Sequence, residues 1–113
     1  MVRIEVYTDT AGRIHGFAAK GHSGFAPHGQ DIVCAAVSVL LQTAVLGLEK
    51  AAGVLPQTEI ADGRLVCRLT SEQAAQPKAE AVLEAMLVGL EAVAAEYGDY
   101  VSVRLSSTQP LPR

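Results

Sequence analysis

Residues 21–36 read GHSGFAPHGQDIVCAA, and the rest of the chain is organised around this stretch. It places His22 at the end of an extended segment and Cys34 in the first turn of a long apolar helix, with a loop rich in glycine and proline between them. A thiol at a helix start lies near unpaired N–H groups and the positive end of the helix dipole, which favour the thiolate. An imidazole that the loop brings back to this thiol could act as its base. The stretch therefore suggests a cysteine nucleophile.

The bulk composition bounds the class of protein. With 113 residues, of which 50% are hydrophobic and 19% charged, the chain is long enough for one domain with its own core. The net charge of -3 and the lack of a Lys/Arg run argue against nucleic acid as a partner. The N-terminal segment does not resemble a signal peptide, and the polar residues within 32–48 favour a buried helix over a membrane span. We therefore expect a cytoplasmic protein, away from membranes, whose two cysteines stay thiols.

Periodicity predicts two β-hairpins, each followed by a helix, and then a last strand. Strands are expected over 2–7 and 13–20, and again over 58–60 and 65–70 around an Asp-Gly turn. Helices are expected from Asp31 to near Gly53 and from Pro77 to near Gly98, with a last strand over 100–105. The order β-β-α-β-β-α-β predicts a single small α+β domain over residues 1–106, with two long helices packed on a mostly antiparallel sheet. Residues 107–113 are expected to form a flexible tail, and the strand order does not follow from the pattern.

The cysteines and histidines also have ordinary structural interpretations. A free cysteine is most often buried and inert, and Cys34 lies only towards the edge of its helix's apolar face. Cys67 lies in mid-strand on the apolar side, where core packing is the best interpretation. His15 alternates within a strand and fits a solvated sheet face, whereas His28 fits either a surface loop or a substrate contact.

A zinc site and a positioning carboxylate are further interpretations. His22, His28, Cys34 and Cys67 offer two imidazoles and two thiols, but their spacing matches no compact zinc motif. No metal and no cofactor are therefore expected. Asp31 is first of all a helix N-cap, and secondly a group that could orient the imidazole of His22.

The sequence also resembles a known family at these residues. Gly21-His22, the glycine-bearing loop and residues 31–38 (DIVCAAVS) closely resemble the signature of the ribosomal-processing cysteine protease Prp family, including the spacing from His22 to Cys34. The resemblance implies an endopeptidase with a Cys/His dyad, in which Cys34 is the nucleophile, His22 is the general base and a thioester is the intermediate. It further implies that the substrate is the precursor of a large-subunit ribosomal protein, whose N-terminal extension is removed by a bacterial, cytoplasmic homodimer. Ser23 stands where alanine is expected more often.

The loop between the dyad residues has an expected role of its own. Gly24, Phe25, His28 and Gly29 belong to a segment that we expect to fold over the bound peptide and gate access to the thiol. Backbone N–H groups near the helix start are expected to hold the oxyanion. Two other functions stay open: a non-catalytic ribosome-associated module that binds a peptide, and a thiol-based transferase or redox protein. The last ranks lowest because the sequence contains no Cys-x-x-Cys pair.

Overall fold

The computed structural model describes residues 1–27 and 29–107 of the chain. In order, its elements are β1 (Val2–Thr8), β2 (Ile14–Lys20), α1 (Ile32–Lys50), β3 (Gln57–Ala61), β4 (Arg64–Arg68), α2 (Ser71–Ala74), α3 (Pro77–Glu96) and β5 (Val101–Ser106). The predicted α+β class is confirmed, with the two long helices and both hairpins in the expected places. The predicted flexible tail falls mostly on residues 108–113, which lie outside the described residues, as does His28.

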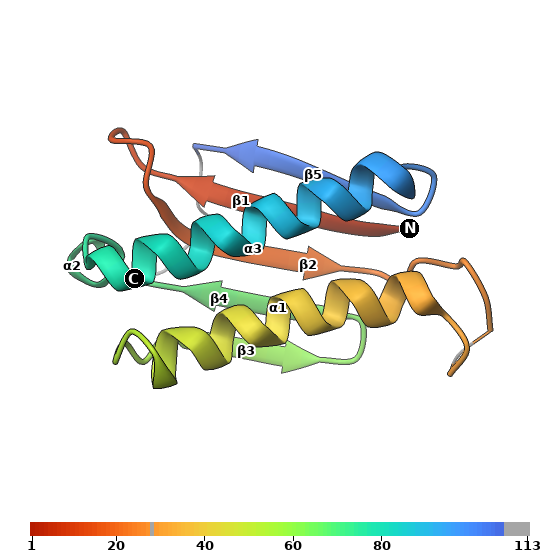
Figure 1. The fold of residues 1–113 in the computed structure, drawn as a ribbon, viewed down its shortest axis with the longest axis horizontal. Coiled ribbons are helices and arrows are strands. Elements are labelled where there is room, and N and C mark those ends of the chain that lie inside the picture. The colour runs from red at the N-terminus through yellow and green to blue at the C-terminus, as the bar shows by residue number, and fades with distance from the viewer. Residues whose placement is uncertain (28, 108–113) are drawn as a thin grey trace.

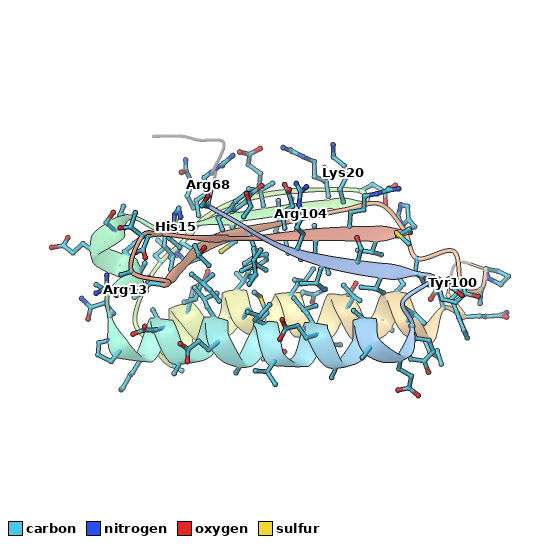
Figure 2. All side chains as sticks on the ribbon, turned by 90° about the horizontal axis from the view of Figure 1, so that it is seen from above. Arg13, His15, Lys20, Arg68, Tyr100 and Arg104 are labelled. Atoms are coloured by element: carbon cyan, nitrogen blue, oxygen red, sulfur yellow. The ribbon has the colours of Figure 1, made fainter. Side chains whose placement is uncertain are left out.

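The strands form one sheet in the order β3-β4-β2-β1-β5. Three neighbouring pairs are antiparallel, and β5 lies parallel to β1 at one edge, because α3 carries the chain back across the sheet before β5 begins. The helices α1 and α3 lie side by side over one face (Figure 1), and the side view in Figure 2 shows the sheet and the helices as two layers. The other face of the sheet carries no helix in the described part of the chain.

The core lies between the sheet and the helix layer. Alternation in β1 buries Val2, Ile4 and Val6, as the sequence predicts for a strand with one apolar face. The two long helices bury a stripe at the spacing of helical turns, made of Val33, Val37, Leu41, Ala44 and Leu48 in α1 and Ala79, Leu83, Met86 and Leu90 in α3. By length and composition α1 could cross a membrane, but a core helix passes the same test, and α1 packs as one here.

The short helix α2 is an element that the sequence interpretation missed. Thr70 caps it, because its hydroxyl accepts from Gln73 N (3.1 Å) while the Gln73 side chain accepts from Thr70 N (3.0 Å). This reciprocal capping box is readable in the sequence as Thr-x-x-Gln. The strand β4 ends at Arg68, two residues before its predicted end.

Strand register brings several segments to one end of the molecule. Arg3 at the start of β1 pairs with Lys20 at the end of β2, and Lys20 pairs with Arg64 at the start of β4. The loop that follows β2 and the first turn of α1 lie at this same end, on the right in Figure 1. The segments that carry His22 and Cys34 are therefore neighbours in space.

Candidate active site

Cys34 is the third residue of α1 and is half-buried. Asp31 caps the helix as predicted, because its Oδ1 accepts a hydrogen bond from Cys34 N at 2.8 Å. The N–H of Cys34 is thus already bonded and is not free to hold an oxyanion. The N–H groups of Ile32 and Val33, two residues and one residue earlier, form no hydrogen bond within the described residues, and they are the better candidates for that role.

The carboxylate of Asp31 also anchors the loop in front of the helix. Its Oδ2 accepts from the hydroxyl of buried Ser23 and from the backbone N–H groups of Phe25 (3.1 Å) and Ala26 (3.4 Å). Burial raises the pKa of Asp31, but the hydrogen bonds from Ser23, Cys34, Ala26 and Phe25 outweigh it and hold the pKa below its ordinary value. Within the described residues no hydrogen bond joins Asp31 to His22, so the loop and the helix take all of the carboxylate's bonds. Ser23 is thus a loop anchor.

His22 lies just after β2 and rests on the turn between β3 and β4. A Cβ added at Gly63 would lie only 2.8 Å from His22 Nε2, and Gly21 N donates to Gly63 O at 2.8 Å. Gly21 itself has a φ of +96°, and a side chain there would collide with Met1 O. Gly63 is a site residue that the sequence interpretation missed, because its position depends on the pairing of β2 with β4.

The two predicted dyad residues lie at the same end of the molecule but are not bonded to each other here. Among the hydrogen bonds of residues 1–27 and 29–107, none joins His22 to Cys34. His22 is exposed, whereas Cys34 is half-buried at the start of α1. The described geometry brings their segments to one end of the molecule without a hydrogen bond between the two side chains.

Phe25 connects the loop to the C-terminal end of α3. Its ring meets Tyr97 edge-on at a centroid distance of 5.7 Å and meets Tyr100 edge-on at 5.2 Å. Tyr100 lies beside the loop, at the start of β5 (Figure 2). The sequence interpretation did not place either tyrosine near the site. Opening of the loop would have to break both ring contacts.

The remaining candidates fall into two groups. Gly24 and Gly29 are exposed loop residues with φ of +74° and +88°, conformations that favour glycine. Cys67 is buried, and desolvation raises the pKa of its thiol to about 12, so it is a neutral core residue as predicted. His15 is half-buried near the start of β2, at the opposite end of that strand from His22. Within the described residues no group of three or more His, Cys, Asp or Glu side chains could hold a metal ion.

Together these features define a class of protein. A small α+β domain with a half-buried thiol in a capped helix turn, and with a histidine at the adjoining strand end, has the parts of a cysteine hydrolase. The family model for the cysteine protease Prp matches residues 1–102. The chain therefore belongs to the cysteine protease Prp family.

Relatives and solved structures agree with this assignment. The ribosomal processing cysteine protease Prp of Bacillus subtilis is 33% identical over 91 residues, which cover 77% of this chain and 81% of the relative. The Staphylococcus aureus protein of the same name is 24% identical over 101 residues, or 89% of this chain and 95% of the relative. A structure of the S. aureus protease with a covalently linked product peptide has a TM-score of 0.84 at 23% identity and covers 94% of this chain and 100% of that one. The Streptococcus mutans protein SMU.848 has a TM-score of 0.83 at 26% identity, covering 93% and 96% of the two chains.

Proposed function

We propose that this cysteine protease removes the N-terminal extension of a large-subunit ribosomal protein precursor, with Cys34 as nucleophile and His22 as general base. The curated relatives are named ribosomal processing proteases, and the S. aureus protease has been solved with a substrate peptide. The observation that carries the proposal is the position of Cys34, a half-buried thiol held at the start of α1 by the Asp31 cap.

The reaction follows from these groups. His22 accepts the proton of the Cys34 thiol, and the thiolate attacks the scissile carbonyl carbon. The N–H groups of Ile32 and Val33 at the helix start stabilise the oxyanion of the tetrahedral intermediate. The C–N bond then breaks as His22 returns the proton to the leaving amine, which leaves a thioester on Cys34. Water, deprotonated by His22, hydrolyses the thioester and restores the thiol.

The loop over residues 23–30 gates the site in this proposal. Asp31 holds the first half of this loop near Cys34 through hydrogen bonds from Ser23, Phe25 and Ala26. Gly24 and Gly29 supply the backbone freedom, and Phe25 latches the loop to Tyr97 and Tyr100. A bound peptide that replaces the tyrosine contacts of Phe25 would release this latch and open the gate.

Cleavage of the precursor from the same genome tests the dyad. Cys34→Ala abolishes cleavage and leaves the circular dichroism spectrum unchanged, whereas a fully active variant would disprove the mechanism. His22→Ala slows iodoacetamide labelling of Cys34 near neutral pH, while the control His15→Ala removes an imidazole at the far end of β2 and leaves labelling unchanged. A thiol that reacts slowly in the native protein, together with tight peptide binding and no cleavage, would favour the non-catalytic peptide-binding module instead.

We also propose that the protease works as a cytoplasmic homodimer, with the outer ridge of α1 as the contact. Ile32, Val39 and Leu46 recur every seven residues and are 60%, 62% and 50% exposed. No charged residue interrupts the chain between Asp31 and Glu49, so two copies of this ridge can pack without burying a charge. Residues seven positions apart lie on one side of a helix, so these three side chains form a continuous apolar ridge.

The oligomeric state is testable with a matched pair of variants. Val39→Glu places a charge on the α1 ridge and should shift the sedimentation coefficient from dimer to monomer. Val88→Glu is the control, because Val88 is 67% exposed on the outer side of α3. A native protein that sediments as a monomer, or a Val39→Glu variant that stays dimeric, would contradict this interface.

A further inference from the structure

The face of the sheet away from the helices concentrates basic residues. Five of the nine lysine and arginine residues of the chain line one hollow of about 530 Å³ on this face, namely Arg3, Lys20, Arg64, Arg68 and Arg104. Lys20, Arg68 and Arg104 extend from this side in Figure 2. They come from four different strands, so the chain shows no basic run although the folded surface has a basic cluster.

Strand register arranges three of these cations in a row. Arg64, Lys20 and Arg3 are successive cross-strand partners on β4, β2 and β1. Neighbouring strands lie about 4.8 Å apart, so the row spans about 10 Å. Like charges directly opposite each other in a sheet are destabilising. A row of three therefore indicates a surface shaped for a ligand that supplies the missing negative charge.

The acidic residues on this face do not neutralise the row. Glu5 pairs with Arg104, and Glu59 pairs with Arg68 at 2.6 Å and with Arg64 at 3.2 Å. Arg3 and Lys20 form no ion pair within residues 1–27 and 29–107, and both are exposed. Arg3 and Lys20 are thus fully available to an anion, and Arg64 is partly available because it also pairs with Glu59.

The hollow beside the row suits a ligand that is more than a point charge. Its lining combines the apolar residues Ala18 and Val66 with the long cationic side chains. Arginine presents a planar fork that matches phosphate oxygens. A nucleotide, which joins a phosphate through its sugar to a base with flat faces, fits a lining that mixes cationic and small apolar side chains.

The charge pattern selects among possible occupants. A second copy would bring the same five cations against these five, which opposes face-to-face pairing. A peptide with one acidic side chain would engage one cation of the row. A nucleic-acid strand, which carries a negative charge on every nucleotide, engages all three together. The helix layer, whose outer side carries Glu84 and Glu91, would repel such a polyanion and so confine it to the sheet face.

We propose that this basic face binds the phosphate backbone of single-stranded RNA. Lys20 lies two residues before His22, and Arg64 follows Gly63, against which His22 rests. RNA on the row would therefore lie beside the candidate active site, and its link to the processing of a ribosomal protein precursor rests on the proposed function. The proposal departs from the expectation, drawn from the net charge and the lack of a basic run, that nucleic acid is not a partner.

The test measures binding of fluorescein-labelled oligouridylate of about 12 nucleotides by fluorescence anisotropy. It uses the Cys34→Ala protein, so its result does not depend on the proposed cleavage. Three phosphate contacts predict a salt slope near −2, which is a loss of affinity of about 20-fold between about 50 and 200 mM salt. Arg3→Gln with Lys20→Gln should reduce that loss to about threefold. Lys50→Gln with Lys78→Gln changes the net charge equally but on the helices, and should keep the full 20-fold loss.

Each other outcome overturns the proposal. If the two double variants weakened RNA binding equally, only the net charge of the protein would matter. Tighter binding of a polyglutamate peptide of the same charge would identify a carboxylate partner, and displacement of the RNA by inorganic phosphate at an equal phosphate concentration would identify a small-anion site. A change of sedimentation coefficient in the Arg3→Gln, Lys20→Gln variant would identify a second copy as the occupant. Absence of RNA binding in a folded protein would refute the proposal and leave the cleavage mechanism untouched.

Discussion

Replacing Gly63 with alanine tests the proposed role of His22 through a residue outside the dyad. The new Cβ would lie 2.8 Å from His22 Nε2, and ordinary contact begins at 3.4 Å, so the ring must move by at least 3.4 − 2.8 = 0.6 Å. A misplacement of about 1 Å in a catalytic group can cost about 100-fold in rate. We therefore expect kcat/KM for the precursor to fall by about 10- to 100-fold, which corresponds to about 1.4 to 2.7 kcal/mol of transition-state stabilisation.

Gly53 provides the matched control for backbone strain. Its φ is +68°, against +67° for Gly63, and a Cβ at Gly53 would meet no atom within 4 Å. Both alanine variants should lose about 1 to 2 kcal/mol in urea unfolding, because both force alanine into the left-handed region. Only Gly63→Ala should lose cleavage and slow the labelling of Cys34 by iodoacetamide. If the two variants were equally stable and equally active, the position of the His22 ring against Gly63 would not matter for catalysis, and the assignment of His22 as the base would lose its support.

Three other changes separate chemistry from folding. Cys67→Ser should cost about 1 to 3 kcal/mol, because it buries a hydroxyl among apolar groups, yet keep cleavage; a folded but inactive variant would contradict the core role of Cys67. Leu83→Ala should cost about 2 to 5 kcal/mol in urea unfolding, since Leu83 is fully buried; a smaller loss would mean that the core collapses around the gap. The pKa of Asp31 is below its ordinary value of 3.8 in the folded protein, so its stabilising effect is complete above 3.8 and is lost as the pH falls through the folded pKa. The near-ultraviolet circular dichroism signal of the packed rings of Phe25, Tyr97 and Tyr100 should therefore be constant at neutral pH and be lost only in acid. The Asp31→Asn variant should show a weaker signal at every pH.

Local sequence signals predicted every element of this fold except the short helix α2, whose capping box was not recognised. Alternation in β1, the turn at Asp62-Gly63 and the Asp31 cap each act within a few residues, so their patterns are visible in the chain. The order β3-β4-β2-β1-β5 and the parallel pairing of β1 with β5 depend on contacts between residues that are about 100 positions apart, such as Val2 and Val101. Such pairings leave no local pattern, and the strand order therefore came only with the structure.

The same division applies to the site. The segment from His22 to Cys34 is contiguous, and its glycines, its cap and its thiol could be read in order. Tyr97 and Tyr100 are more than 60 residues beyond Cys34, and the helical pattern explains Tyr97 as a core residue. Nothing in the chain indicates that Phe25 would lie against them at 5.2 and 5.7 Å. Residues recruited to a site by tertiary packing alone are invisible to periodicity.

One strand pairing underlies both the proposed catalysis and the proposed RNA contact. The register that sets Lys20 opposite Arg64 also brings Gly63 to the backbone N–H of Gly21 and so to the ring of His22. A slip of this pair by one residue would turn Arg64 towards the core and expose Leu65, because alternate residues face opposite sides of a sheet. The burial of Leu65 and Cys67 against the helices therefore fixes this register. The same hydrophobic core thus fixes the position of His22 against Gly63 and the row of cations beside it.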